Sequence, residues 1–150
     1  YRFRHPYCNL GPVSGAMGYG VPGAIGAQVA DPDRMVFAWC GDGGFLMTGQ
    51  EAAAAVQENL PIKIIVCDNS AWGSILVTQN KRFGDWDFGT RLKSPDFAAL
   101  AVGYGMQGYT VRKTEEFAGA LKSAMAHEGP ALIHLVLDLR DTSPYSGSAR

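Results

Sequence analysis

The sequence predicts an α/β domain in which a parallel sheet of about five to six strands carries helices on both faces. Two short apolar runs, Met35–Cys40 and Ile62–Cys67, have the length and composition of buried strands, with a helical segment between them. Further apolar runs alternate with helical segments downstream, which is the pattern of a parallel sheet covered on both sides. The 150 residues, 47% of them hydrophobic, are enough to build the core of one such domain.

In the first half of the chain, a helix is expected over Ala16–Val29. Pro22 lies inside that segment and marks a break or a fresh start, because proline removes a backbone donor and clashes with the preceding turn. Thr48 and Glu51 have the spacing of a capping box, in which each side chain accepts a hydrogen bond from the other residue's backbone. They predict a helix that opens at Thr48 and continues through Glu58.

The second half continues the alternation of helical and apolar segments. After the second strand the sequence predicts a helix from about residue 71 to Asn80, a loop over 81–94, a helix over Pro95–Val102, a strand over Gly108–Val111, a helix over Thr114–His127 and a strand over Ala131–Leu137.

Charge and cysteine content exclude several kinds of partner. Thirteen basic and fourteen acidic side chains, mixed along the chain, give no electrostatic reason to expect nucleic acid or a membrane surface as partner. Cys8, Cys40 and Cys67 lack CxxC spacing, and two of them end predicted strands, so reduced core thiols are expected. No apolar run is long enough to cross a membrane. We expect a soluble, cytoplasmic protein in which residues 1–150 are one domain of a longer polypeptide.

Polar residues follow both of the first two predicted strands. Gly41-Asp42-Gly43-Gly44 follows the first, and Asn69, which follows the second, lies 27 residues after Asp42. The carboxyl ends of parallel strands lie side by side, so the two side chains should meet. A carboxylate and an amide oxygen suit Mg²⁺, which completes its shell with phosphate oxygens. Because the glycines leave backbone N–H groups accessible to a phosphate, the motif predicts a cation-bridged diphosphate site.

This arrangement resembles the diphosphate-binding motif of thiamine-diphosphate (ThDP) enzymes, in which GDG is followed, after a similar spacer, by asparagine. The resemblance is to the C-terminal domain of the acetolactate synthase-like group, and it covers nearly the whole chain. It includes residues 15–27 upstream of the motif, Met47–Glu51 after it and Pro95–Ala101 further downstream.

The resemblance implies ThDP and Mg²⁺ as cofactors, with Asp42, Asn69 and the backbone carbonyl of Ala71 as metal ligands. The Gly15 carbonyl would accept a hydrogen bond from the 4′-amino group of the cofactor, and Met17 would support its bent conformation. On its own, Met17 would fit an ordinary helix core as well. The cofactor-binding residues implied by the resemblance are Gly15, Ala16, Met17, Gly41, Asp42, Gly43, Gly44, Asn69, Ala71, Trp72 and Gly73.

Asp68 departs from many relatives, which have asparagine at this position. Two roles are open for its carboxylate: a second negative charge near the metal, or an acceptor for local backbone N–H groups, which we favour. His5, His127 and His134 carry no pattern that predicts a catalytic role.

The resemblance also implies a glutamate that activates the cofactor from a separate N-terminal domain, usually of a neighbouring subunit. Glu51 and Glu58 do not match that role and are expected on a helix surface. The catalytic residue is therefore expected outside this fragment, on a pyrimidine-binding domain of the same enzyme. The fragment alone should be inactive, and the intact enzyme should be a homodimer or homotetramer.

The implied activity is that of a lyase or transferase, a decarboxylase or carboligase of a 2-oxo acid, in which the cofactor is the electron sink. Acetolactate synthases carry a tryptophan near the position of Thr78, so this chain is expected to prefer another 2-oxo acid over acetolactate formation from pyruvate. Ile75 and Leu76 are candidates to line the pocket. The aromatic loop Phe83–Phe88 is a candidate lid, with core packing or a subunit contact as alternatives.

Two other interpretations remain open from the sequence. A β subunit of a 2-oxoacid:ferredoxin oxidoreductase shares the GDG motif, although the chain lacks the clustered cysteines of an iron–sulfur site. A non-catalytic ThDP-fold domain would keep the fold without the reaction. Other nucleotide-binding classes are disfavoured because neither GxGxxG after a strand nor GxxxxGK[ST] occurs.

Overall fold

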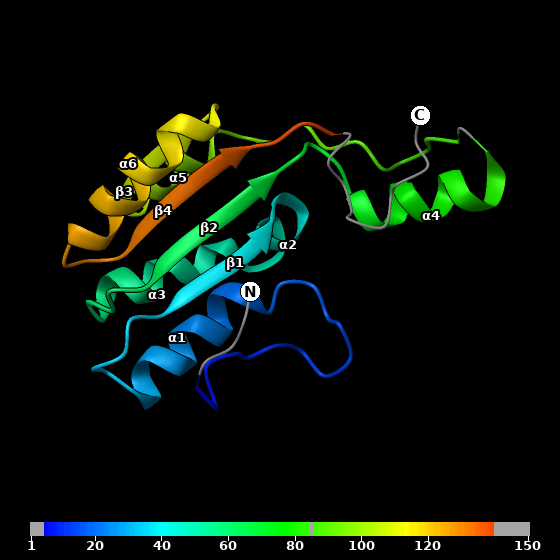
Figure 1. Cartoon of the computed structure of the whole chain (residues 1–150). Helices are drawn as coiled ribbons and strands as arrows, with labels where there is room; N and C mark the ends of the chain where they lie inside the picture. Colours follow the sequence, from blue (N-terminus) through cyan, green and yellow to red (C-terminus); the bar gives the residue numbers. More distant parts are fainter. Residues whose placement is uncertain (1–4, 85, 140–150) are drawn as a thin grey trace.

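Four parallel strands form one sheet at the centre of the molecule (Figure 1). The computed structural model describes residues 5–84 and 86–139. In these residues the sheet has the strand order β1-β2-β4-β3. The strands are β1 (Phe37–Gly41), β2 (Lys63–Asp68), β3 (Gln107–Val111) and β4 (Ala131–Val136). Because every neighbouring pair is parallel, all four carboxyl ends lie along one edge of the sheet.

Helices connect the strands. They are α1 (Gly20–Ala30), α2 (Asp42–Thr48), the 3-10 turn η1 (Gly49–Glu51), α3 (Ala52–Gln57), α4 (Gly73–Phe83), α5 (Phe97–Gly103) and α6 (Thr114–Ala126). The predicted α/β class with a parallel sheet is confirmed. The predicted count of five to six strands is wrong for the described residues, which form four, because the sequence holds no further strand-like apolar run between them. In the described part of the chain, no helix has the length and apolarity needed to cross a membrane.

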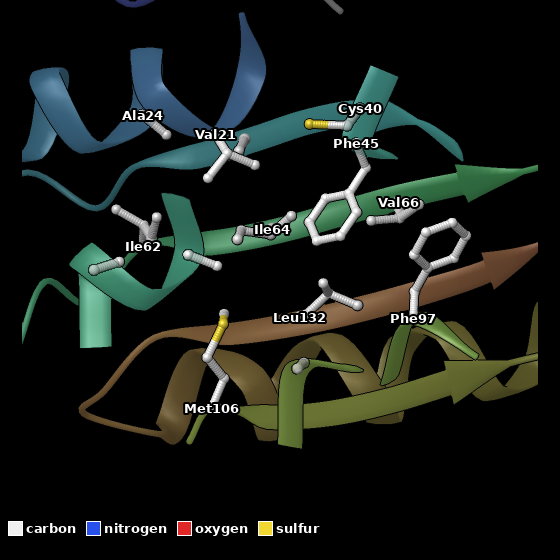
Figure 2. Close-up of a cluster of buried hydrophobic side chains, with 14 residues drawn as sticks. Val21, Ala24, Cys40, Phe45, Ile62, Ile64, Val66, Phe97, Met106 and Leu132 are labelled. Atoms are coloured by element: carbon white, nitrogen blue, oxygen red, sulfur yellow. The ribbon is translucent and has the colours of Figure 1, made fainter. Parts of the chain in front are cut away.

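Successive residues of a strand point to opposite faces of the sheet, and a separate core forms on each face. On one face, Ile64, Val66 and Leu132 pack with residues of α1, α2, α3 and α5 (Figure 2). On the other face, Ile133 packs in a smaller cluster with residues of β3 and α6, among them Ala124. Helices therefore cover both faces, as the sequence predicts.

Strand β1 is covered on only one face by the described residues. Its side chains alternate, with Ala38 and Cys40 buried in the larger core, while Phe37 and Trp39 on the opposite face are 42% and 65% exposed. In the part of the chain that the structure describes, the strand also lies at an edge of the sheet and pairs with β2 alone. An apolar face and a free strand edge thus occur together on β1.

Helix α1 begins at Gly20, four residues later than the sequence predicts. Gly15 and Gly18 adopt positive φ values of 70° and 83°, so the preceding segment turns instead of extending the helix. Pro22 consequently falls in the first turn, where backbone N–H groups have no partner within the helix. The proline therefore causes no break and instead marks a fresh start, the other expected alternative. The expected helix over Ala16–Val29 is wrong at its start.

The helix after the GDGG motif also begins at a different residue from the one predicted. It starts at Asp42, and η1 and α3 continue it to Gln57. Thr48 lies at the N-cap position of η1, but its side chain makes no capping hydrogen bond. Its hydroxyl instead donates a 2.6 Å hydrogen bond to the Gly18 carbonyl. The capping box expected from Thr48 and Glu51 is therefore wrong, because the backbone is already helical before Thr48.

The remaining elements lie within a few residues of their predicted bounds. Helix α4 begins at Gly73, about two residues later than expected, and ends three residues later, at Phe83. Helix α5 begins at Phe97, because the side chain of Asp96 accepts a 3.0 Å hydrogen bond from the backbone N–H of Ala99 and caps it.

Candidate functional site

The register of β1 against β2 brings the two predicted motifs together. Gly41 at the end of β1 pairs with Cys67 near the end of β2. The next residues, Asp42 at the start of α2 and Asp68 at the end of β2, therefore lie side by side at the carboxyl edge of the sheet. Asn69 follows directly, in the turn that connects β2 to α4.

The side-chain oxygens of Asp42 and Asn69 converge on a single backbone group. Asp42 Oδ2 accepts a hydrogen bond from the backbone N–H of Ala71 at 3.1 Å, and Asn69 Oδ1 accepts from the same N–H at 3.2 Å. The second oxygen of Asp42, Oδ1, accepts from the backbone N–H of Gly43 at 2.8 Å. A buried carboxylate and an amide oxygen thus lie around one point, which is a donor set that suits a hard divalent cation.

The electrostatic environment of Asp42 also favours a bound cation. Burial raises the pKa of Asp42, and the adjacent carboxyl of Asp68 raises it further, while hydrogen bonds from Gly43 and Ala71 oppose the rise. The ionised form of Asp42 thus lacks a positive partner within the described residues, and a bound cation would supply one.

The backbone of Ala71 is held in place by a short ladder. An isolated antiparallel bridge joins Ala71 to Arg91, and its two hydrogen bonds run from Trp72 N to Thr90 O and from Leu92 N to Ser70 O, both at 2.8 Å. Neither bond uses the Ala71 carbonyl. The carbonyl predicted as a third metal ligand is therefore on a fixed backbone and outside this ladder.

The glycines of the motif differ in their surroundings. A Cβ at Gly43 would lie 2.2 Å from the ring of Trp72, so the tryptophan packs directly on the backbone there. A Cβ at Gly44 would meet no atom within 4 Å, so this position borders open space. The expectation that both N–H groups are accessible is wrong for Gly43, whose N–H is donated to Asp42 Oδ1. Gly44 lies in the first turn of α2, where an N–H has no partner within the helix.

The predicted residues upstream of α1 lie in a turn and not in a helix core. Met17 is 50% exposed, and the neighbouring Gly18 is fastened to α2 by the hydrogen bond from Thr48. The alternative that Met17 is ordinary core is therefore wrong.

One large cavity unites the predicted cofactor-binding residues. It has a volume of about 1380 Å³, and its lining includes every residue of the predicted set, from Gly15 to Gly73. Ser74 and Ile75 at the start of α4 line it as well, whereas Leu76 is buried and does not. The cavity also extends over the exposed face of β1, where Trp39 lies.

Helix α4 stands apart from the sheet and helices of the main body (Figure 1). Phe83, Trp86 and Phe88, which belong to it and to the loop that follows, are all exposed. Core packing, one of the roles considered for this loop, is therefore wrong. A lid or a subunit contact remains a prediction.

A buried polar cluster beside the site is not predicted by the sequence patterns. His134 Nε2 lies 2.9 Å from Asp68 Oδ2, and the hydroxyl of Ser94 donates to Asp68 Oδ1 at 2.7 Å. Asp68 does accept the local backbone N–H of Ser70, at 2.8 Å, as favoured from the sequence. The only available signal for the rest was a histidine within an otherwise apolar buried strand. Among the described residues, no cluster of three His, Cys, Asp or Glu side chains is arranged to hold a metal ion.

Comparison with known proteins gives consistent matches. A family profile described as "Thiamine pyrophosphate enzyme, C-terminal TPP binding domain" matches residues 1–135. The mitochondrial acetolactate synthase catalytic subunit of Saccharomyces cerevisiae is 37% identical over 138 residues, which are 92% of this chain and 20% of that protein. The large subunit of acetolactate synthase isozyme 2 of Escherichia coli (strain K12) is 35% identical over 125 residues, which are 83% of this chain and 23% of that protein.

A solved structure has the same fold. The thiamine diphosphate-dependent 4-hydroxybenzoylformate decarboxylase of Rhodococcus jostii RHA1 matches with a TM-score of 0.80 and 35% identity, over 85% of this chain and 24% of that chain. The chain thus spans about a fifth to a quarter of the length of these relatives.

Proposed function

This chain belongs to the thiamine pyrophosphate enzyme family as a C-terminal TPP-binding domain, and on this premise we propose that it holds the cofactor diphosphate, through Mg²⁺, in a 2-oxo acid decarboxylase or carboligase. Thiamine pyrophosphate and ThDP are the same cofactor. The observation that carries the proposal is the approach of Asp42 Oδ2 and Asn69 Oδ1 to the same N–H of Ala71, at 3.1 and 3.2 Å.

The donor set fits the group that the family implies. Asp42 and Asn69 offer hard oxygen ligands. Burial and the adjacent Asp68 carboxyl raise the pKa of Asp42, and a bound cation would favour its ionised form. The open space beside Gly44 leaves room for phosphate oxygens next to these ligands. Few protein ligands are needed, since Mg²⁺ usually retains water and phosphate oxygens.

In this proposal, different parts of the site bind different parts of the cofactor. Asp42, Asn69 and the Ala71 carbonyl would hold Mg²⁺, and the turn at Gly15 and Met17 would meet the pyrimidine end of the cofactor. When bound, ThDP supplies the electron sink for loss of CO₂ from a 2-oxo acid. The chain's own part is to bind and orient the cofactor.

The proposal includes partners beyond this chain. The chain spans 20% and 23% of two acetolactate synthase relatives, and β1 has an exposed apolar face with Phe37 and Trp39. We propose that the activating glutamate comes from an N-terminal pyrimidine-binding domain of the same cytoplasmic enzyme, shared between the subunits of a homodimer or homotetramer. Sedimentation of the intact protein under assay conditions tests this part. A fully active monomer would contradict the shared site.

The proposed substrate is a 2-oxo acid other than the pyruvate of acetolactate synthase. Ile75 is exposed and lines the cavity, so it can contact a substrate, whereas the buried Leu76 cannot. Thr78 is exposed, and its hydroxyl donates to the Ser74 carbonyl at 2.9 Å, so the position holds a small side chain where acetolactate synthases are expected to carry tryptophan.

The deciding assay supplies the full-length enzyme with ThDP, Mg²⁺ and a panel of 2-oxo acids that includes pyruvate. We expect CO₂ release or carboligation with another 2-oxo acid, little acetolactate from pyruvate, and no turnover after Mg²⁺ is removed by a chelator. Efficient acetolactate formation from pyruvate alone would overturn the substrate assignment. Undiminished turnover without any divalent cation would overturn the cation site.

A further inference from the structure

A chain of hydrogen bonds links the middle of β4 to the cation-binding turn through Asp68. His134 of β4 is 4% exposed, and its ring meets the ring of Phe97 edge-on, with centroids 5.1 Å apart and an interplanar angle of 90°. Its Nε2 lies 2.9 Å from Asp68 Oδ2. Packing against Phe97 therefore fixes the plane of the imidazole, and this in turn fixes one oxygen of Asp68.

The other oxygen of Asp68 fixes the turn itself. Oδ1 accepts hydrogen bonds from the backbone N–H of Ser70 at 2.8 Å and from the hydroxyl of Ser94 at 2.7 Å. Ser70 adopts a positive φ of 56°, which a non-glycine residue rarely holds without support. The carboxylate of Asp68 provides that support on the inner side of the turn.

The two neighbouring residues of the turn are the proposed ligands. Asn69 precedes Ser70 and Ala71 follows it, so any change in the φ of Ser70 moves the Asn69 oxygen and the Ala71 backbone relative to Asp42. Both oxygens of Asp68 are meanwhile occupied by protein donors. Asp68 is thus bonded to the scaffold, whereas Asn69 and Ala71 line the cavity.

We propose that Asp68, fixed by His134 and Ser94, is a positioning residue that sets the geometry of the cation site through the turn 69–71 and does not itself bind the cation. This inference rests on the proposed function, because it assumes that Asn69 and Ala71 are ligands. It assigns roles to Asp68, Ser94 and His134 that the motif does not contain.

The orientation of the imidazole follows from its partner. The carboxylate of Asp68 accepts hydrogen bonds from the Ser70 N–H and the Ser94 hydroxyl at Oδ1, and an ionised carboxylate can only accept. Nε2 of His134 therefore donates. Among the described residues Nδ1 makes no hydrogen bond, and Asp96 Oδ1 lies 3.8 Å from it. A neutral donor of similar reach should consequently be able to replace the imidazole.

The test measures Mg²⁺ affinity in the full-length enzyme, from the quenching of tryptophan fluorescence as Mg²⁺ is titrated at fixed ThDP. His134→Leu removes the donor and should weaken Mg²⁺ binding by about 10- to 100-fold, the usual effect of losing a group that orients a metal ligand. His134→Gln keeps an N–H of similar reach and should restore most of the affinity. The double variant Asp68→Asn with His134→Glu reverses the donor and the acceptor, and it should also bind more tightly than His134→Leu.

Control variants separate this inference from the proposed function. Lys63→Met changes a buried polar residue at the amino end of β2, the strand that ends at Asp68, and should leave Mg²⁺ affinity unchanged. Asp42→Asn should lose affinity if the cation site is correct; normal binding by that variant would overturn the proposed function itself. If Asp42→Asn loses binding while His134→Leu binds normally, only the positioning role is wrong.

The remaining outcomes concern Asp68 itself. Asp68→Asn keeps an acceptor oxygen for Ser70 and Ser94 and should cost less affinity than Asp42→Asn. An equal loss in these two variants would identify Asp68 as a ligand and overturn the inference. Circular dichroism verifies that each variant is folded; should His134→Leu fail to fold, the comparison of His134→Gln and the double variant with Asp68→Asn decides the question.

Discussion

The two ends of the sheet bury charged side chains in opposite ways. At the amino end of β2, the Lys63 side chain is almost fully buried, and its Nζ donates to the carbonyls of His127 and Gly129 at 2.8 and 2.7 Å. At the carboxyl end of the neighbouring strand, Asp42 is buried as well, but its donors are neutral: the backbone N–H groups of Gly43 and Ala71 and, at 3.5 Å, the Ser94 hydroxyl. Its charged neighbour is a second carboxylate, that of Asp68.

The difference distinguishes a structural charge from a ligand. Burial lowers the pKa of Lys63 and raises that of Asp42, because in both cases burial disfavours the charged form. Two carbonyls after α6 stabilise the ammonium group, so Lys63 requires no external partner. The environment of Asp42 adds the negative charge of Asp68 instead, so its ionised form is best stabilised by a cation. A buried charge that its protein surroundings leave uncompensated is thus the better indicator of a binding site.

The strongest test of this comparison is Asp42→Asn in the full-length enzyme. We expect Mg²⁺-dependent ThDP binding to fall by more than about 100-fold, since the only carboxylate among the proposed ligands is lost. Because the folded-state pKa of Asp42 is raised, the carboxylate costs stability as the pH rises through that pKa. Without cation at neutral pH, the variant should therefore be at least as stable as the parent. Fluorescence titration and thermal melts measure the two effects; unchanged cofactor affinity would refute the ligand role.

A matched pair of glycines separates packing from binding. Gly43→Ala would place a methyl group 2.2 Å from the Trp72 ring and should destabilise the fold by about 1–3 kcal/mol, the usual cost of overpacking. Gly44→Ala meets no atom within 4 Å, so it should fold normally and weaken ThDP binding only by narrowing the space beside the diphosphate. Denaturant melts and ThDP titrations of both variants check this. Equal stability losses in the pair would mean that Trp72 does not pack on Gly43.

Lys63→Met tests whether the buried charge of Lys63 stabilises the fold. The substitution retains the apolar stem but leaves the carbonyls of His127 and Gly129 without their donor, which should cost about 1–3 kcal/mol of unfolding free energy. Chemical denaturation of the intact enzyme measures this loss, with Mg²⁺ affinity as the internal control. A variant as stable as the parent would show that water replaces the ammonium at these carbonyls at no cost.

The carboxyl-end motif was predictable because it depends only on neighbouring strands. Two parallel strands with a helix between them bring Asp42 and Asn69 together whatever the rest of the sheet does. The His134–Asp68 contact was not predictable, because it requires β4 to pair with β2 in a register that aligns His134 with Val66. That strand order brings together residues 66 positions apart, and no local pattern encodes it.

The predicted start of α1 was wrong for a local reason. Apolar and small residues continue from Ala16 into the helix, but Gly15 and Gly18 adopt positive φ and hold the segment in a turn. The hydrogen bond from Thr48 to Gly18 then secures this turn from another element. Glycine permits both outcomes, and the contact with α2 selects one of them.

The smallest expected effect concerns Cys40, which is buried at the carboxyl end of β1 without being placed in the cation site. Burial, with a smaller contribution from Cys67, raises its pKa from the ordinary value of 9.0 to about 11. Since the thiolate is the reactive form, iodoacetamide at pH 8 should leave Cys40 unmodified in the native enzyme while alkylating the exposed Cys8. Peptide mass mapping before and after unfolding measures both sites. Because the folded-state pKa is raised, Cys40 favours the native state at neutral pH, and this contribution is lost as the pH rises from 9 towards 11. Rapid labelling of Cys40 in the native enzyme would show instead that the carboxyl end of β1 opens. The difference between Lys63 at the amino end of the sheet and Asp42 at its carboxyl end would then reflect local stability.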